Sequence, residues 1–356
     1  RAAVMLGTGL AVGAIIRFFD LYTTNLGNMF SELSVWVFLG TVISVRSRTP
    51  FQAAGAVFGF CFGMLAAYYT TARLTLPAPQ LVEMDYNIGV KGEGFEYIFS
   101  RGKGLVSIRY NGVQLLDDTV RPNFWRAPTN NDEGCAEPFE FAFWKTAGLY
   151  ARCDNLTAEA KGEFVTVRAN YTLPDGQMLP VDFAIDGAGR CDITMTWQGE
   201  HTELPEFGLL FPLRRELTEV SYLGLGPRET TADRTAGGKM GVWNYNVQQD
   251  FAQYTPVYPQ ECGSRTGVYS ATVTGSIPGI GFAGDGMTFS ALPYTPHELE
   301  NARHLYELPR DDSKTVVRCA AFQRGVGGDN SWGAKPHADT CFAVEKGTSF
   351  RFMIQK

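Results

Sequence analysis

The stretch from Gly325 to Gly333 (GVGGDNSWG) has the residue types of a sugar-binding loop. A strand does not run through so many glycines, because glycine loses the most backbone entropy on folding and offers no side chain to pack. The segment is therefore expected to be a loop that presents the indole of Trp332. The apolar face of a pyranose can stack on this aromatic plane while neighbouring polar groups bind its hydroxyls. The alternative is an indole that folds back and covers a sheet edge.

Three further loops combine charged residues with glycine and proline. The first is residues 121–134 (RPNFWRAPTNNDEG), where two prolines restrict φ and the arginines need partners such as Asp132. The second is residues 222–229 (YLGLGPRE), followed by Asp233 and Arg234, and the third is residues 258–265 (YPQECGSR). For the second and third loops we favour a structural role, in which salt bridges hold the backbone in one conformation.

In this order, and with the chain end at Ile354–Lys356, the four motifs resemble the C-terminal domain of bacterial β-galactosidases of glycoside hydrolase family 2, also called the β-galactosidase small chain. The resemblance covers residues 81–356. It implies a mainly β fold, a large antiparallel β super-sandwich of the galactose-mutarotase-like class.

The resemblance also implies roles for single residues. Trp332 matches the tryptophan that forms a platform for the sugar at the mouth of the site, particularly for the aglycone. Gly134 matches a glycine at the hinge of a mobile active-site loop, and Glu137 falls within that loop. Arg126 and Asp132 match the rigid approach to the loop, so we expect them to have a structural role.

The same resemblance places the catalytic chemistry elsewhere. A retaining β-galactosidase needs two carboxylates about 5 Å apart, one as nucleophile and one as acid/base. In this family both glutamates, and the magnesium and sodium sites, belong to a TIM-barrel domain that precedes this one. Residues 1–80 are too few for a barrel of about 250 residues. We therefore expect no catalytic residue, metal site or cofactor in this chain, and no lactose hydrolysis by it alone.

Three hypotheses for the function are open. In the first, the chain is a non-catalytic part of a β-galactosidase, which hydrolyses terminal β-D-galactosides such as lactose, and works with a partner chain or domain that carries the TIM barrel. In the second, it is a membrane-tethered carbohydrate-binding module with no enzymatic role. A split subunit must expose an apolar docking patch, whereas a binding module needs only the Trp332 pocket. In the third, it is a chimeric or truncated gene product.

Charge divides the chain into two regions. Residues 1–80 contain no lysine, five arginines and two acidic residues, and residues 81–356 hold the other 26 basic and 35 acidic residues. The excess of acids in the second region argues against a polyanion-binding surface, so nucleic acid is not an expected partner. Its length is sufficient for one large all-β domain.

The first region has the composition of a membrane segment. Its apolar stretches are Ala2–Ile16, Leu33–Val45 and Phe51–Tyr69, and the last has the length of a spanning helix. Residues 1–73 are therefore expected to form about three transmembrane helices and to place the chain at a membrane, although the family domain itself is usually cytoplasmic. A buried hydrophobic hairpin is the alternative. Residues 74–80, with two prolines, are expected to form a linker.

The second region is patterned for strands. Apolar residues fall on every second position in many short segments separated by turn residues, which favours an antiparallel sandwich. The one helix expected is Pro138–Leu149. The expected strands are Phe95–Ser100, Leu105–Tyr110, Phe164–Leu173, Val181–Asp186, Asp192–Trp197, Val220–Leu225, Val268–Val273, Met287–Leu292, Thr315–Phe322, Thr340–Glu345 and Ser349–Ile354.

The cysteines and histidines show no metal-binding spacing. The seven cysteines lack C-x-x-C pairs and are expected to be small buried apolar residues in a reducing compartment, with disulfide pairing among the six after residue 80 as the alternative. The four histidines are dispersed, so no zinc site is expected.

Overall fold

The computed structural model describes residues 4–12, 43, 47, 49–75, 77–254, 258–330 and 332–356. The chain separates into two compact units, Arg1–Pro77 (the N-terminal unit) and Ala78–Lys356 (the β-rich unit).

In the N-terminal unit, residues 4–12 are helical and α4 spans Pro50–Thr75. The two helices lie close together at glycines: a Cβ on Gly9 would lie 2.2 Å from the carbonyl oxygen of Phe60. Among the described residues, the stretch Pro50–Ala67 of α4 is the one long and apolar enough to cross a membrane, with a mean hydropathy of 1.5. Apart from Ile43, the expected apolar stretch Leu33–Val45 lies outside the described residues.

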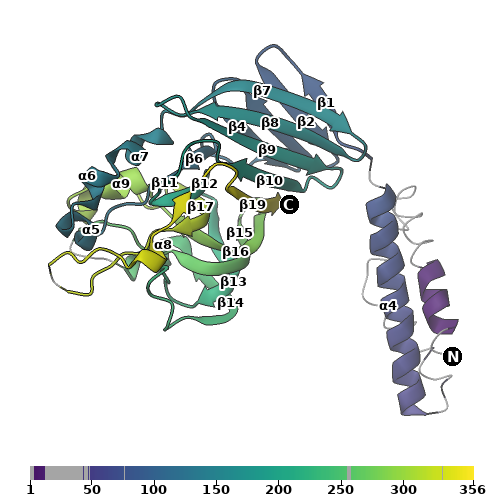
Figure 1. Ribbon diagram of the computed structural model, residues 1–356. Helices are drawn as coiled ribbons and strands as arrows, with labels where there is room; N and C mark the ends of the chain where they lie inside the picture. The colour runs from purple at the N-terminus through teal and green to yellow at the C-terminus, as the bar shows by residue number, and fades with distance from the viewer. Residues whose placement is uncertain are drawn as a thin grey trace. The chain divides into compact units, whose positions relative to one another are not determined.

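The β-rich unit consists mostly of antiparallel sheet, which confirms the mainly β prediction (Figure 1). A five-stranded sheet has the order β1-β2-β3-β4-β5, and a twelve-stranded sheet runs β14-β13-β15-β16-β19-β10-β9-β8-β7, with β17, β12 and β6 joined in succession to β16. A short pair, β11–β18, stands apart from both.

The longest strand, β16, belongs to the large sheet. The bounds of the strands are β1 Gln80–Glu83, β2 Asn87–Gly92, β3 Phe95–Ser100, β4 Gly104–Tyr110, β5 Val113–Gln114, β6 Arg121–Asn123, β7 Arg152–Lys161, β8 Phe164–Thr172, β9 Met178–Asp186, β10 Cys191–Thr196, β11 Thr202–Glu203, β12 Glu206–Arg214, β13 Leu217–Gly226, β14 Lys239–Asn246, β15 Arg265–Gly275, β16 Ile280–Leu292, β17 Lys314–Gln323, β18 Ala343–Val344 and β19 Ser349–Gln355.

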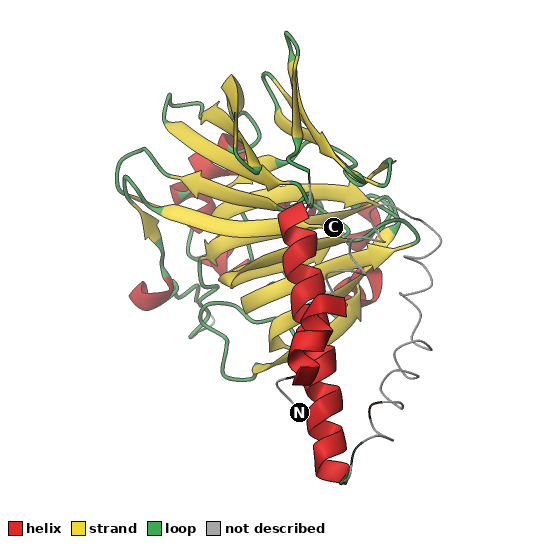
Figure 2. Cartoon of the chain, turned by 90° about the vertical axis from the view of Figure 1, so that its right-hand side faces the viewer, coloured by secondary structure: helices red, strands yellow, loops and turns green. Residues whose placement is uncertain are grey.

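The small sheet packs face to face on the β7–β10 part of the large one. Alternate residues of β3 and of β9 are buried, as expected for strands with one face on a core. Phe99 of β3 and Phe183 of β9 meet with ring centroids 4.9 Å apart. The hydroxyl of Tyr97 donates to the carbonyl of Gly189 at 2.6 Å, so a buried polar group is satisfied at the same interface. Figure 2 shows the strands as the bulk of the unit, with short helices at its periphery.

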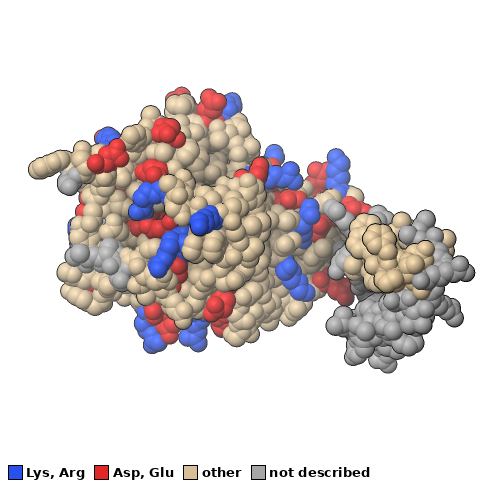
Figure 3. Space-filling view, turned by 90° about the horizontal axis from the view of Figure 1, so that it is seen from below, with Lys and Arg blue, Asp and Glu red and all other residues tan. Residues whose placement is uncertain are grey.

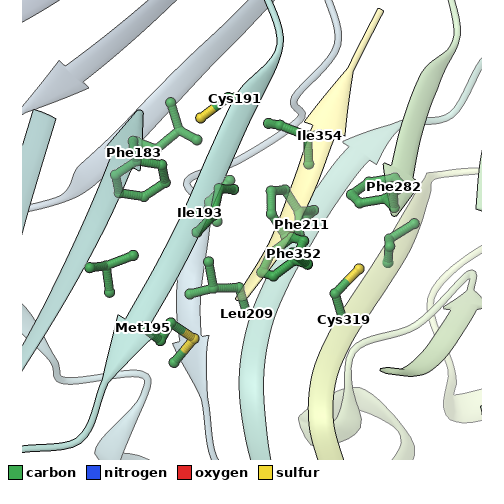
Figure 4. Packing of buried hydrophobic residues seen from close by; sticks show 14 of the residues in the cluster. Phe183, Cys191, Ile193, Met195, Leu209, Phe211, Phe282, Cys319, Phe352 and Ile354 are labelled. Carbon is green, nitrogen blue, oxygen red and sulfur yellow. The ribbon is translucent and has the colours of Figure 1, made fainter. Parts of the chain in front are cut away.

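The centre of the core lies where β10, β19 and β12 meet (Figure 4). Ile193 of β10 lies opposite Phe352 of β19 in the ladder. Phe211 of β12 packs edge-on against Phe282 of β16, with centroids 5.3 Å apart. This continuous apolar core keeps the large sheet rigid. The loops that connect its strands are therefore held in fixed positions at the ends of the sheet.

Most of the expected strands are confirmed, and two segments differ. Thr340–Glu345 was expected to be one strand, but a 3₁₀ turn occupies Ala338–Thr340 and only the two-residue β18 follows. The expected helix Pro138–Leu149 is two short helices, α6 (Glu137–Glu140) and α7 (Ala142–Ala147). They break at Phe141, whose φ of −101° and ψ of 14° depart from the helical region.

The short helices gather at one end of the β-rich unit, beside the long loop that follows β17 (Figure 1). Besides α6 and α7, these are α5 (Asn130–Gly134) and α9 (Pro296–Asn301), and α8 (Val247–Ala252) lies near the same loop in that view. The four sequence motifs belong to this end.

Candidate functional site

The four motifs, far apart in the sequence, converge on one pocket of about 350 Å³. We call it the four-loop pocket. The first motif supplies three of the lining residues, and the segment 229–234 of the second motif supplies another three. Five come from the third motif and Tyr254 just before it, and two come from the glycine-rich loop. The lining residues are Thr129, Asn130, Asn131, Glu229, Thr231, Arg234, Tyr254, Gln260, Glu261, Cys262, Ser264, Val326 and Gly327.

Asn131 closes the base of the glycine-rich loop. Its side-chain Nδ2 donates to the carbonyl of Val326 at 3.0 Å and to that of Ala334 at 2.7 Å, so one amide joins both ends of the loop. From the second motif, Asp233 accepts the backbone N–H of Gly327 at 2.7 Å. Gly327 has a φ of 62°, a conformation that favours glycine. The loop is thus held at its base by two other motifs.

Trp332 stands at the far end of this loop and is 89% exposed. The indole does not fold back onto a sheet edge. The backbone N–H of Trp332 donates to Oδ1 of Asn330 at 2.8 Å, which shapes the turn that carries it. Its aromatic face is therefore open to contact by a ligand or a partner.

Gly134 and Gly333 are in backbone contact. A Cβ on Gly134 would lie 3.3 Å from Cα of Gly333, and a Cβ on Gly333 would lie 2.5 Å from the carbonyl carbon of Gly134. Gly333 also has a φ of 75°. The end of α5 therefore rests on the residue next to Trp332, and no side chain fits between them.

Arg126 and Asp132 form a buried ion pair beneath the pocket. Nη1 and Nη2 of Arg126 donate to the two carboxylate oxygens at 2.5 and 2.9 Å, and both side chains are 3% exposed. Nη2 also donates to the carbonyl of Gly325 at 2.9 Å. Burial opposes ionisation of Asp132, but Arg126 and the N–H and hydroxyl of Thr129 outweigh it and lower its pKa. The pair fixes the start of the Trp332 loop.

Glu137, the first residue of α6, is also buried and paired. Its Oε1 accepts from Nε and Nη2 of Arg324 at 3.0 and 2.9 Å. Arg324 reaches on to Glu203 at 2.7 Å. Burial raises the pKa of Glu137, and Arg324 offsets part of this effect. Because Arg324 directly precedes Gly325, this pair is a second anchor for the same loop.

A second buried network, which the sequence analysis missed, lies behind the pocket. Arg318 of β17 donates to Glu206 of β12 at 2.8 Å and to Glu261 of the third motif. Gln323 donates to both carboxylates, at 3.0 and 3.2 Å. Burial raises the pKa of Glu206.

No motif marks Glu206 or Arg318. Glu206 directly precedes the mostly apolar stretch of β12, and Arg318 interrupts the apolar stretch of β17 between Val317 and Cys319. A charge at each of these places is the signal that could have found the pair.

The carboxylates of Glu206 and Glu261 share two donors, Arg318 and Gln323, and both side chains are buried. Glu206 is 1% exposed and Glu261 is 8% exposed. The guanidinium of Arg318 bridges them and compensates one of the two negative charges, while the amide of Gln323 donates to both. They hold β12, β17 and the third motif together.

The second and third motifs are held by their own charges, as expected. Glu229 accepts from Arg234 at 2.7 Å and from the backbone N–H of Gly263 at 2.8 Å. Arg265, fully buried, donates to Asp250 at 2.7 Å and lies 4.3 Å from the ring centroid of Tyr245. These contacts fix the wall of the pocket opposite the first motif.

All seven cysteines are free thiols in this structure; four of them are buried, whereas Cys61, Cys135 and Cys341 are half-buried. In the described part of the chain, no three His, Cys, Asp or Glu side chains come together as a metal-binding group. On the face of the β-rich unit that Figure 3 shows, acidic and basic side chains are interspersed, without a region of one sign.

Comparison with known proteins assigns the family. A family model described as the β-galactosidase small chain matches residues 91–354. The β-galactosidase of Lactobacillus delbrueckii subsp. bulgaricus is 38% identical over 284 residues, covering 78% of this chain and 28% of that protein. The β-galactosidase small subunit of Latilactobacillus sakei is 32% identical over 289 residues, covering 70% of this chain and 89% of that protein.

A weaker likeness is to the solved structure of galactose 1-epimerase from Lactobacillus acidophilus NCFM. The TM-score is 0.40 and the identity 7%, with 79% of this chain and 98% of that one covered. A score this low supports no conclusion about the present chain. This chain spans less than a third of the length of the full-length β-galactosidase from L. delbrueckii. On the family match and the small-subunit relative, the chain belongs to the β-galactosidase small chain family.

Proposed function

We propose that this chain is the non-catalytic part of a β-galactosidase and completes the sugar site of a TIM-barrel-bearing partner chain or domain. The observation that carries the proposal is the convergence of four separate motifs on one pocket, one of which also carries the exposed Trp332. The family match supports it, as does the relative from Latilactobacillus sakei that is itself named a small subunit. The substrate would be a terminal β-D-galactoside such as lactose.

The glutamates near the site support a non-catalytic role. Glu137, Glu206 and Glu261 are each buried and paired with an arginine, whereas a glycosidase needs two carboxylates that reach the sugar. We therefore assign the nucleophile, the acid/base and the magnesium and sodium sites to the barrel portion. Arg126 and Asp132 have a structural role in this proposal.

Gly134 is proposed as a hinge. It lies at the end of α5 and touches Gly333, so rotation of its backbone would move the residues that follow relative to Trp332. Glu137, three residues further along the chain, is paired with Arg324 and would limit how far that segment moves.

A docking surface for the barrel is supported by apolar side chains on and around α6 and α7. Phe139 is 84% exposed and Tyr150 is 67% exposed, with Phe143 and Leu149 partly exposed on the same segment. Such a patch, next to the Trp332 loop in the fold, has the chemistry of an interface.

The finer fold and the location are also proposals. The face-to-face sheets of the β-rich unit support the super-sandwich of the galactose-mutarotase-like class.

The apolar helix α4 supports a membrane-spanning N-terminal segment of about three helices and a membrane location. Carbonate extraction tests this: the full chain should stay with the membrane fraction and residues 78–356 should not. Release of the full chain by carbonate contradicts the proposal.

Replacing Trp332 with alanine tests the sugar platform. In the enzyme assembled with its barrel partner, loss of the indole should weaken binding of the aglycone or of glucose by about 1–3 kcal/mol, the scale of one aromatic contact. Stability should change by less than about 0.5 kcal/mol, because the side chain is 89% exposed. Trp332→Phe should restore part of the affinity.

Tyr306→Ala is the matched control, since Tyr306 is 82% exposed and lies outside the four motifs. Equal inhibition constants for glucose in wild type, Trp332→Ala and Tyr306→Ala would remove Trp332 from the sugar site.

A further inference from the structure

We propose that the four-loop pocket is itself a binding site for a neutral polyhydroxylated ligand, a single monosaccharide unit, separate from the platform at Trp332. Trp332 is not among the residues that line the pocket. Its volume of about 350 Å³ is at the small end of ligand sites, which suits one sugar ring rather than an oligosaccharide. The inference goes beyond the proposed function, because it needs no barrel partner.

The lining favours hydroxyl groups. Asn130 and Gln260 bond reciprocally: the backbone N–H of Asn130 donates to Oε1 of Gln260 at 3.2 Å, and Nε2 of Gln260 donates to Oδ1 of Asn130 at 3.2 Å. These bonds fix both amides yet occupy only one of the four side-chain N–H groups they hold. Each hydroxyl of a sugar both donates and accepts, and primary amides offer both partners.

A third side-chain amide at the pocket, that of Asn131, has a defined orientation. Both N–H groups of Asn131 are directed to the carbonyls of Val326 and Ala334. Its Oδ1 is thereby left as an acceptor at the wall of the pocket. A fixed acceptor beside fixed donors selects a ligand with hydroxyls at set positions, which a flexible surface would not do.

The charges in the wall favour a neutral ligand. Arg234 is paired with Glu229 at 2.7 Å, and Glu261 is paired with Arg318 behind the wall. A phosphate or carboxylate would face both Glu229 and Glu261, with Arg234 as the single cation among the lining residues. An Arg–Glu pair offers N–H donors and carboxylate acceptors side by side, the arrangement that two neighbouring hydroxyls can bridge.

Tyr254 supplies the apolar surface of the pocket. Its hydroxyl accepts the backbone N–H of Glu229 at 2.9 Å, so the O–H proton is directed elsewhere and its ring is held in place. Sugar sites combine such an aromatic ring with convergent polar groups. The four-loop pocket therefore holds, in one cavity, the donors, acceptors and aromatic ring that a pyranose needs.

The test titrates the full 356-residue chain with D-galactose, D-glucose and inorganic phosphate by saturation-transfer NMR and calorimetry. The variants are Asn130→Ala and Arg234→Ala. Asn130 is exposed, and Arg234 has a side chain 56% exposed, so both variants should fold, and circular dichroism checks that they do. Arg152→Ala is the control, since Arg152 forms an exposed ion pair with Asp154 on β7, away from the pocket.

We expect one of the two sugars to bind the wild type, and each pocket variant to weaken that binding at least tenfold. Arg152→Ala should leave it unchanged, and phosphate should not compete. The inference is overturned if neither sugar binds, if phosphate displaces the sugar, or if the pocket variants bind as wild type does. Loss of binding in Trp332→Ala alone would also overturn it, while leaving the proposed platform intact.

Discussion

At the scale of the residue, Asn131 decides whether the Trp332 loop keeps its shape. Its amide bonds the carbonyls at both ends of the loop, Val326 and Ala334. Asn131→Ala should cost about 1–3 kcal/mol in stability, the price of two orphaned acceptors. Hydrogen exchange of residues 326–334 should rise.

The neighbour Asn130 provides the control for that experiment, because its side chain bonds Gln260 instead. Asn130→Ala should leave the exchange of the loop as in the wild type. Equal exchange rates of residues 326–334 in the two variants would show that the Asn131 side chain does not hold the loop.

The ion pair of Asp132 should make part of the free energy of unfolding sensitive to acid. The pKa of Asp132 is lowered in the fold from an ordinary 3.8, so its ion pair with Arg126 stabilises fully above that value and is lost as pH falls through the lower folded pKa. Asp132→Asn should reduce the free energy of unfolding by about 3 kcal/mol at pH 7, since a buried arginine loses its counter-charge.

Urea unfolding of wild type and Asp132→Asn at several pH values checks this. The difference in unfolding free energy between the two proteins should be constant from neutral pH down to about pH 5. It should become smaller only below pH 3.8, the ordinary pKa of the carboxyl. Equal unfolding free energies of the two proteins at pH 7 would contradict a stabilising ion pair between Arg126 and Asp132.

How far single residues could be foreseen depends on whether a motif contains them. The sequence suggested Asp132 as a partner for an arginine of the same loop, because the arginines of a proline-restricted loop need partners, and the structure joins Arg126 to it. Glu206 and Arg318 lie 112 positions apart in strands that carry no motif. Only the register of β12 on β17 brings them together, and local pattern does not encode that register.

At the scale of the element, the alternation of apolar and polar residues identified the strands that have one buried face. It missed strands that are buried on both faces or that lie at a sheet edge. β10 alternates buried and half-buried residues and was expected. β12 is buried at eight consecutive positions, because both of its faces are covered, so it has no period of two. β7 and β14 lie at opposite edges of the large sheet and carry many polar residues, which hides their pattern.

Gly333 is the residue on which the contact between α5 and the Trp332 loop depends. Gly333→Ala combines a left-handed φ of 75° with a Cβ 2.5 Å from the carbonyl carbon of Gly134. Gly112→Ala is a matched control, since Gly112 has a φ of 79° and nothing within 4 Å of an added Cβ.

The control should lose about 1 kcal/mol in unfolding free energy, the cost of the left-handed backbone alone. Gly333→Ala should lose more and should also weaken sugar binding at Trp332, because the loop must move away from α5. Equal losses in the two variants, with sugar affinity unchanged, would show that the close contact has no role.

At the scale of the whole molecule, the β-rich unit has the features of one part of a larger site. It offers an exposed indole, an apolar patch around α6 and α7 and a polar pocket, while the glutamates nearest to them are locked in ion pairs. The ordered motifs allowed the family to be recognised from sequence. The convergence of those motifs on one cavity could not be foreseen, because it arises from the long-range pairing of the large sheet.

The most direct measurement of the central claim is a complementation assay with a chromogenic β-galactoside. Residues 78–356 are mixed with the β-galactosidase of Lactobacillus delbrueckii subsp. bulgaricus from which the aligned region has been deleted, and each part is also assayed alone. We predict hydrolysis by the mixture and none by residues 78–356 alone. Turnover by residues 78–356 in the absence of the barrel portion would contradict the assignment of the chemistry to a partner.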